Sequence, residues 1–367
     1  MVIQRITIYK ANIPLKAPFK IALGTTESAR NIFVSVETDE GVKGWGEASP
    51  FSPVVSETQD TCVAIGADIA KVLIGHDPLD VRGCMRQVER RFPLSPTIRS
   101  AFDMALYDIL GQVANLPLYA LLGGGYRELV TDCTVGIDEP TAMAVSAKEI
   151  QKRGFPVVKI KLGTTVEEDL ERLKAVREAL GPNFPIRVDA NQGWGRVEAL
   201  RALRAMARFR IEFCEQPVAA WDLASMQMIR RHSSIPIMAD EALFNLRDAL
   251  RLVQTEACDY FNIKLAKSGG ITEALRIISL AESVNIPCMI GCMTETRLGL
   301  TAAAHLAVAF PIIRFVDLDG ADMHSVDPVM GGLQYSGKGE IVVSDKPGLG
   351  VDVNEDFLGH LERLEIC

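Results

Sequence analysis

Three acidic residues and two lysines in the middle of the chain each follow a short apolar run, a position where charged side chains are uncommon. The acids are Asp189 in RVDANQGW, Glu215 in EFCEQPV and Asp240 in IMADEAL, and the lysines are Lys161 in VVKIKLG and Lys267 in NIKLAKSGG. Each run is rich in Val, Ile, Phe or Met, which is typical of a buried parallel strand. These five residues are therefore candidates for chemistry at strand ends.

The three acids predict a metal site. Carboxylates that end three consecutive strands can converge on one point, where they repel one another unless a cation neutralises them. A ligand set made only of oxygen atoms favours Mg²⁺, with Mn²⁺ as a possible substitute. Each acid alone would more often cap a helix or form a surface ion pair. Because Asp189, Glu215 and Asp240 occur at the same phase of one repeat, we expect them to bind a metal together.

The lysines predict proton transfer. Lys159 and Lys161 alternate to the same strand face, and an amine beside another cation has a lowered pKa, so it can serve as a general base. A single lysine at a strand end is usually solvated. With Lys267 on the other side of the site, a carbon held between two amines could lose a proton to one and regain it from the other. That exchange inverts a stereocentre.

A repeat of 25 to 28 residues positions these groups. Each step fits one strand, one helix and two short loops, and eight such units form a (β/α) barrel with its chemistry at the strand ends. Counted from Thr134, Lys161 ends the second strand and Lys267 the sixth, so the two amines are expected to face each other across the barrel mouth. The anchors of the repeat are Thr134, Lys161, Asp189, Glu215, Asp240, Lys267, Cys292 and Asp317.

The sequence before the repeat predicts a second domain. Residues 1–60 alternate polar and apolar, which favours a small antiparallel sheet with a turn at 39–41. Residues 58–121 have helical periodicity, including a helix with Ser100 as its N-cap. Between the repeat units, the segment 164–181 predicts a helix with a capping box at Thr165 and Glu168 and a stop at Gly181. Strands and helices ahead of a βα repeat indicate a separate α+β domain.

Composition limits the function classes. The 367 residues are 48% hydrophobic and 23% charged, enough for one large core and a smaller domain. The net charge of -8, from 39 basic and 47 acidic residues, argues against binding to nucleic acid or to an anionic membrane. The first ten residues alternate like a strand, and no apolar stretch reaches spanning length. We therefore expect a cytoplasmic protein.

The chain resembles the enolase superfamily, and within it the muconate-lactonizing-enzyme subgroup. The resemblance rests on KIK at 159–161, the three strand-end acids and KLAKSGG around Lys267, and it extends from PLKAPFK near the start to KPGLG near the end. It implies an α/β fold, a modified TIM (β/α) barrel at 126–320 with an N-terminal α+β capping domain at 1–125. A C-terminal segment at 321–367 would complete the barrel edge and return to the capping domain. It also implies Mg²⁺-dependent enediolate chemistry on a carboxylate substrate, and a homo-oligomer.

The end of the eighth strand narrows the activity. RFVDLDGADM places Asp317 and Asp319 on one strand face, four strands round from Glu215. A substrate that bridges the metal and this pair needs a carboxylate, an acidic α-carbon and a cation, as in a zwitterionic dipeptide. With ETRLGLTAAAH at 295–305, the pair resembles that of the dipeptide epimerases typified by L-Ala-D/L-Glu epimerase, where it holds the substrate ammonium. The alternative is a solvated acidic turn.

This resemblance implies an isomerase that inverts the α-carbon of the C-terminal residue by a 1,1-proton transfer. Lys161 and Lys267 would exchange the proton from opposite faces, and Lys159 and Asn191 would offset the developing negative charge. The resemblance further assigns Glu241 to orient a lysine. The substrate-binding residues that it implies are Thr134, Lys159, Asn191, Cys292, Thr294, Asp317 and Asp319.

The loop after PFK bears on side-chain preference. Relatives that act on glutamyl dipeptides look to carry an Arg there, and in PFKIALGTTES the aligned position is Gly24. Losing a cation that would pair a second carboxylate favours an Ala-Xaa dipeptide with small or hydrophobic Xaa. Lys20 would restore an acidic preference if it reached the substrate. The expected walls are Phe19, Ile21, Phe51 and Val54.

Other activities remain open at this point. A cycloisomerase or an o-succinylbenzoate synthase would share the metal and both lysines, but it has no use for Asp317 and Asp319. An N-acylamino acid racemase acts on a substrate without the ammonium. A mandelate-type enzyme needs a His at the end of the seventh strand, and GCMTETR has none. A binding protein without turnover would leave two opposed lysines unexplained.

Overall fold

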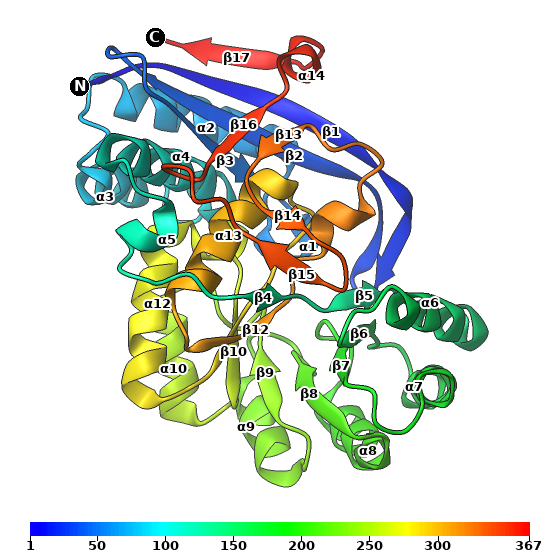
Figure 1. Cartoon of the computed structure of the whole chain (residues 1–367). Coiled ribbons are helices and arrows are strands. Elements are labelled where there is room, and N and C mark those ends of the chain that lie inside the picture. The colour runs from blue at the N-terminus through cyan, green and yellow to red at the C-terminus, as the bar shows by residue number, and fades with distance from the viewer.

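Eight parallel strands form one sheet in the order β12-β11-β10-β9-β8-β7-β6-β5, as Figure 1 shows for the computed structural model, which describes all residues 1–367. The edges of the sheet meet where the backbone N–H of Asp132 donates to the Val316 carbonyl at 3.2 Å. The predicted barrel is therefore confirmed. Its strands are β5 (Cys133–Val135), β6 (Val158–Lys161), β7 (Ile186–Asp189), β8 (Ile211–Glu215), β9 (Ile237–Ala239), β10 (Tyr260–Ile263), β11 (Cys288–Ile290) and β12 (Ile313–Val316).

Helices connect successive strands and cover the outside of the barrel (Figure 1). In α7, the Thr165 side chain accepts from the Glu168 N–H and Gly181 ends the helix, as predicted. The barrel is modified at its eighth unit, where β12 leads into a short 3₁₀ helix, η2 (Gly320–Met323). A further 3₁₀ turn is η1 (Ala207–Phe209). The helices are α6 (Pro140–Lys152), α7 (Val166–Leu180), α8 (Arg196–Met206), α9 (Leu223–His232), α10 (Leu246–Thr255), α11 (Leu265–Ser268), α12 (Ile271–Val284) and α13 (Arg297–Ala309).

A second, antiparallel sheet with the order β17-β1-β2-β3 lies beside the barrel. Its outer strand, β17 (Arg363–Ile366), comes from the C-terminus and pairs with β1. Helix α4 begins at Pro96 after Ser95, so the predicted N-cap at Ser100 is wrong; a proline fits the first turn, and the Ser100 hydroxyl donates to the Thr97 carbonyl inside the helix. The elements are β1 (Ile3–Ile21), β2 (Gly24–Thr38), β3 (Lys43–Ala48), α1 (Ser52–Val55), α2 (Gln59–Leu73), α3 (Val81–Arg91), α4 (Pro96–Ala114) and α5 (Leu118–Leu121).

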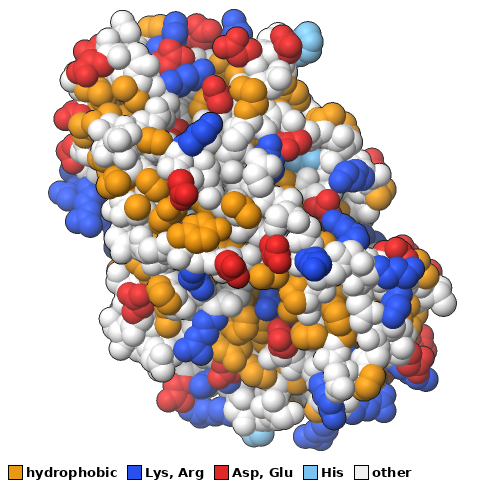
Figure 2. Space-filling model, in the orientation of Figure 1, with side chains coloured by type: hydrophobic (Ala, Val, Ile, Leu, Met, Phe, Trp, Pro, Cys, Tyr) orange, Lys and Arg blue, Asp and Glu red, His pale blue; other side chains and the backbone are white.

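The C-terminal segment runs from the barrel back to this sheet (Figure 1). It forms two small antiparallel sheets, β13 with β16, and β14 with β15 and β4. None of the helices has the length and apolar character that a membrane crossing requires. On the face in Figure 2, acidic and basic side chains are interspersed. The elements are β4 (Leu129–Val130), β13 (Val329–Gly331), β14 (Gln334–Tyr335), β15 (Glu340–Val342), β16 (Val351–Val353) and α14 (Glu355–Gly359).

The long β1–β2 hairpin brings its tip to the barrel mouth (Figure 1). The tip is a two-residue turn closed by the pair Ile21 and Gly24. Gly24 has a φ of +143°, which favours glycine. The hairpin is held on the barrel because the backbone N–H of Ile137 donates to the Lys20 carbonyl at 2.8 Å. Residues near the tip are therefore positioned over the ends of the barrel strands.

Helix α13 contains a buried histidine that makes stability depend on pH. His305 is fully buried, and its Nδ1 accepts from the Tyr119 N–H at 3.1 Å. Burial lowers the pKa of His305 from 6.5 to about 4. As the pH falls, His305 is therefore protonated in the unfolded chain before it is protonated in the folded protein. The contribution of neutral His305 to the unfolding free energy is complete above pH 6.5 and is lost as the pH falls toward 4.

We expect this loss to amount to about 2 kcal/mol between pH 7 and pH 5. It is measured as the difference in unfolding free energy between the wild type and His305→Gln, whose amide can accept from Tyr119 without titrating. Urea unfolding at the two pH values gives that difference. A difference that does not change with pH would contradict the assignment.

Candidate active site

The three predicted metal ligands lie together at the ends of neighbouring strands. Asp189 and Glu215 are the last residues of β7 and β8, and Asp240 directly follows β9. All three are buried, and each offers an oxygen that lies within 4.8 Å of the others. Strand alternation places each acid on the face opposite to its buried apolar neighbour, which is Val188, Cys214 or Ala239. The predicted cluster is therefore formed.

The chemistry of this cluster fits Mg²⁺. Glu215 Oε2 and Asp240 Oδ1 are buried, and their partners are lysine ammonium groups. Lys159 Nζ lies 2.7 Å from Glu215 Oε2, and Lys267 Nζ lies 3.3 Å from Asp240 Oδ1, so each of these oxygens keeps a further lone pair for a cation. Buried carboxylate oxygens with unused lone pairs are the ligands that Mg²⁺ prefers. Burial and the neighbouring Asp189 raise the pKa of Glu215 to about 7, so the cluster favours an added cation.

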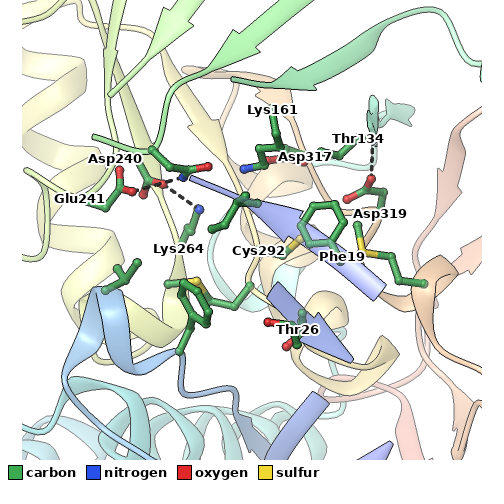
Figure 3. Close-up of a pocket in the computed structure, with 17 residues that line it drawn as sticks. Phe19, Thr26, Thr134, Lys161, Asp240, Glu241, Lys264, Cys292, Asp317 and Asp319 are labelled. Atoms are coloured by element: carbon green, nitrogen blue, oxygen red, sulfur yellow. Dashed lines mark hydrogen bonds and ion pairs between the residues drawn. The ribbon is translucent and has the colours of Figure 1, made fainter. Parts of the chain in front are cut away.

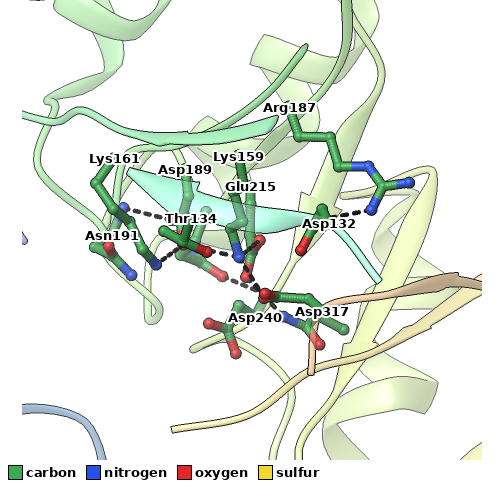
Figure 4. Close-up of polar contacts among 12 residues, drawn as sticks. Asp132, Thr134, Lys159, Lys161, Arg187, Asp189, Asn191, Glu215, Asp240 and Asp317 are labelled. Atoms are coloured by element: carbon green, nitrogen blue, oxygen red, sulfur yellow. Dashed lines mark hydrogen bonds and ion pairs between the residues drawn. The ribbon is translucent and has the colours of Figure 1, made fainter. Parts of the chain in front are cut away.

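A cavity at the ends of the barrel strands is lined by 17 residues, among them Lys161, Asp240 and Asp317 (Figure 3). Lys159 does not line it; this lysine lies among the acids, as Figure 4 shows. Its Nζ is 2.7 Å from both Glu215 and Asp317 and 3.4 Å from Asp189. Although burial lowers the pKa of Lys159, these carboxylates outweigh burial and raise it well above its usual value. We predicted that paired lysines would lower each other's pKa; for Lys159 this is wrong, because its nearest neighbours are anions.

Two other amines enter the cavity from opposite sides of the barrel. Lys161 ends β6 and Lys264 directly follows β10, and these strands are four apart in the sheet order. Lys161 Nζ donates to Asp189 at 2.6 Å and Lys264 Nζ donates to Asp240 at 2.8 Å. Both side chains line the cavity (Figure 3). A substrate held there would lie between the two amines.

The prediction that Lys267 is the second amine of the site is wrong. Strand β10 ends at Ile263, and the short helix α11 carries Lys267 away from the cavity. Its Nζ is fully buried and donates to three backbone carbonyls, those of Asp240, Leu243 and Asn262. Lys267 therefore holds the ends of β9 and β10 together.

This buried ammonium predicts a structural phenotype. In Lys267→Met the three carbonyls lose their donor, and we expect the unfolding free energy to fall by roughly 3 kcal/mol or more. Lys71→Met, which removes an exposed ion pair with Asp68, is the control and should change it by less than about 0.5 kcal/mol. Urea unfolding measures both variants. Wild-type stability in Lys267→Met would refute this role.

The predicted acid pair lines the cavity beyond the metal cluster. Asp317 follows β12 and accepts from Lys159 at 2.7 Å, while Asp319 accepts from the Thr134 N–H at 2.7 Å. Burial and Asp317 raise the pKa of Asp319 to about 6. Burial raises the pKa of Asp317, but Lys159 and Lys161 outweigh burial and lower it to about 2. Lys159 thus bridges Glu215 and Asp317, and one ammonium separates the two anionic groups.

Four predicted substrate-binding residues also line the cavity. Thr134, Cys292 and Thr294 contribute to its wall. Asn191 lines it too, and its Nδ2 donates to Glu241 at 3.2 Å. Glu241 contacts Asn191 and makes no hydrogen bond to a lysine, so its predicted role of orienting a lysine is not supported. Burial and Asp240 raise the pKa of Glu241 to about 8.

The remaining wall of the cavity is largely apolar (Figure 3). It is formed mainly by the β1–β2 hairpin, the segment around α1 and two methionines. Gly24 does not line it; this residue closes the hairpin turn and lies along a neighbouring groove, and Thr26 lies in the wall instead. Lys20 is also absent from the wall. The wall residues are Phe19, Ile21, Thr26, Phe51, Val54, Met293 and Met323.

Sequence reasoning missed several residues of the site. Lys264 is the main one; it follows the apolar run YFNI at once, which is the signal that could have identified it. Asn262, two residues earlier on the same face, donates to Glu215 at 2.7 Å. Behind the acids, Arg187 pairs with the buried Asp132 at 2.7 Å (Figure 4). Two methionines, Met293 and Met323, complete the wall.

Comparison with known proteins finds relatives along the whole chain. Residues 3–123 match the family model "Mandelate racemase / muconate lactonizing enzyme, N-terminal domain", and residues 142–357 match "Enolase C-terminal domain-like". The D-Ala-D/L-Ala epimerase of Cytophaga hutchinsonii is 43% identical over 365 residues, 99% of each chain. The hydrophobic dipeptide epimerase of Enterococcus faecalis is 42% identical over 352 residues, 96% of this chain and 99% of that protein.

A solved structure is also similar over the full length. The crystal structure of the dipeptide epimerase from Cytophaga hutchinsonii, complexed with Mg and the dipeptide D-Ala-L-Val, matches with a TM-score of 0.99 at 43% identity. The match covers 100% of both chains.

Proposed function

The chain belongs to the mandelate racemase/muconate lactonizing enzyme family of the enolase superfamily, and from this premise we propose that it is a Mg²⁺-dependent dipeptide epimerase. The enzyme is an isomerase that inverts the α-carbon of the C-terminal residue. The observation that carries the proposal is one cavity with Lys161 and Lys264 on opposite sides, Asp240 of the metal cluster at its base, and Asp317 and Asp319 beyond. Mn²⁺ is the expected substitute for Mg²⁺, and a homo-oligomer is the expected assembly.

In the proposed reaction one lysine, as the neutral amine, removes the α-proton, and the electron pair moves into the carboxylate to give an enediolate. The other lysine, as the ammonium, returns a proton to the opposite face. Asp189, Glu215 and Asp240 would hold Mg²⁺, which when bound supplies positive charge to offset the negative charge that develops. The two lysines supply both the general base and the general acid, so the reaction needs no third proton-transfer group.

The far end of the cavity favours a cationic terminus on the substrate. Asp319 uses one oxygen for the Thr134 N–H, and Asp317 is already paired with Lys159. A substrate ammonium between the two aspartates would complete their coordination through charge-assisted hydrogen bonds. Such a contact distinguishes a dipeptide from the N-acylated or purely anionic substrates of the alternative activities.

The apolar wall favours a small or hydrophobic C-terminal residue. The side chain would lie against Phe19, Phe51 and Val54, and the cavity has no cation besides Lys161 and Lys264 to pair with a second carboxylate. Relatives named for D-Ala-D/L-Ala and for hydrophobic dipeptides support this preference.

A panel of L-Ala-L-Xaa dipeptides tests the proposal. With Mg²⁺ present, kcat/KM for epimerisation should be highest for Xaa such as Ala, Val, Leu or Phe and roughly tenfold or more lower for Glu, because a carboxylate buried against the wall is unpaired. Thr26→Arg places a cation on this wall and should raise the relative rate for Ala-Glu. A wild-type profile that peaks at Ala-Glu would refute the substrate preference, and no epimerisation of any dipeptide would refute the function.

A further inference from the structure

A buried carboxylate of the first domain is bound at the N-terminus of a barrel helix. Glu47, in β3, is fully buried. It accepts from the Thr296 N–H at 2.9 Å, from the Thr296 hydroxyl at 2.8 Å and from the Gly299 N–H at 2.8 Å. Thr296 is the N-cap of α13, so the two backbone N–H donors are groups that the helix leaves unpaired at its start. A negative charge is favoured at this end of a helix.

A glycine in the first turn of α13 lies close to two carboxylate side chains. A Cβ at Gly299 would lie 3.1 Å from Glu47 Oε2 and 2.9 Å from Glu295 Cγ. Both distances are shorter than ordinary van der Waals contact, so a larger residue would require the side chains of Glu295 and Glu47 to shift. Glycine at this position leaves room for both side chains.

Two further polar side chains, one in β2 and one just after β3, hold the segment just before α13. Asn31 Nδ2 donates to Glu47 Oε1 and to the Thr294 carbonyl, both at 2.7 Å. Ser49 Oγ lies 3.2 Å from Thr294 Oγ1 and accepts from the Thr294 N–H at 3.3 Å. The backbone of Thr294 and Thr296 is thus held by hydrogen bonds to Asn31 in β2, Glu47 in β3 and Ser49 just after β3.

This anchor joins two walls of the cavity. On the barrel side, the segment before Thr296 supplies Cys292, Met293 and Thr294 to the cavity. On the other side, the chain leaves β3 at Ala48 and reaches Phe51, another wall residue, three positions later. Neither lysine of the site lies on these segments. Glu47 therefore fixes the distance between two substrate-binding walls but not the position of the amines.

We propose that Glu47 is a positioning residue for substrate binding, which holds the Cys292–Thr294 segment against the first domain through the start of α13. It touches neither the substrate nor the amines. The kinetic consequence rests on the proposed epimerase function, whereas the structural consequence does not.

Glu47→Gln tests the proposal because the amide keeps the shape and loses the charge and half of the acceptor capacity. We expect KM for a good dipeptide substrate to rise roughly tenfold, since small displacements of binding groups are costly, while kcat changes less than about threefold because the amines stay in place. Amide hydrogen exchange at Thr296 and Gly299 should accelerate at least about tenfold, and this measurement needs no substrate.

Glu57→Gln is the matched control. Glu57 is also buried, and it also accepts from the first turn of a helix, from the Thr97 and Ile98 N–H groups of α4. Neither Glu57 nor these two residues line the cavity. It should leave KM unchanged. Ser49→Ala, a milder change at Thr294, should raise KM about two- to threefold and serves if Glu47→Gln does not fold.

Unchanged KM and unchanged exchange in Glu47→Gln, or an equal rise of KM in Glu57→Gln, would overturn the proposal. Faster exchange at α13 in a protein without epimerase activity would overturn the proposed function and leave the anchoring role of Glu47 intact.

Discussion

Replacing Lys264 by methionine is expected to lower kcat for epimerisation by roughly 10³-fold or more in both directions. The substitution removes one of the two amines that line the cavity and keeps a side chain of similar length. General acid–base catalysis by a positioned group contributes about 10²- to 10⁴-fold, and each direction of the reaction needs both amines. Chiral chromatography of Ala-Leu incubated with Mg²⁺ measures the rate.

Proton exchange separates loss of one base from loss of the whole site. With Lys161 intact, the variant should still exchange the α-proton of one epimer with solvent without inverting it. Lys161→Met should show the complementary exchange, on the other epimer. A Lys264→Met variant that keeps more than a tenth of the wild-type rate would contradict the assignment of Lys264.

The second large effect is expected at the metal cluster. In Glu215→Gln the isosteric amide keeps an oxygen for the hydrogen bond from Asn262 but removes a charged ligand. We expect Mg²⁺ affinity to fall by about 100-fold or more and kcat/KM by roughly 10³-fold, because the metal supplies several kcal/mol of charge stabilisation. Isothermal titration calorimetry measures the affinity.

The unfolding free energy provides an independent measurement of Mg²⁺ binding at this cluster. Mg²⁺ at 100 times its dissociation constant should raise the unfolding free energy of the wild type by about 2.7 kcal/mol and leave Glu215→Gln nearly unaffected. Glu212→Gln is the control, since this residue lies on the same strand but pairs with Arg187 at 2.9 Å outside the cluster. Equal Mg²⁺ stabilisation in both variants would show that Glu215 is not a ligand.

The barrel and its acids could be predicted because their information is local and periodic. Each strand is a short apolar run, and the strand ends recur at nearly constant spacing, so Asp189, Glu215 and Asp240 fall at one level of the barrel. The rule that catalytic groups lie at the carboxyl ends of parallel strands then places Asp317 and Asp319 at the same mouth. Period and pattern were sufficient for these residues.

Lys267 shows where periodicity misleads. Lys264 and Lys267 are three residues apart, and a spacing argument accepts either. Local structure separates them, because β10 ends at Ile263 and the inserted helix α11 turns the chain by most of a helical turn before Lys267. The end of the apolar run was the better guide to the strand end than the average repeat length.

Contacts between the two domains could not be predicted from local pattern. Gly24 lies in a hairpin turn beside the cavity and Thr26 lies in its wall, which depends on how the hairpin is seated on the barrel. Glu47 contacts residues more than 240 positions away in the sequence. Alternation in a strand says which face a residue occupies, but not which helix end that face meets.

The most direct test of the account follows the α-proton itself. Wild-type enzyme with Mg²⁺ and L-Ala-L-Leu in D₂O is sampled during the first turnovers, and proton NMR and mass spectrometry locate the label. Transfer between Lys161 and Lys264 predicts that the new epimer carries deuterium at the α-carbon of its C-terminal residue from the start, while the N-terminal residue keeps its proton. A new epimer without deuterium, or no exchange with any dipeptide of the panel, would contradict it.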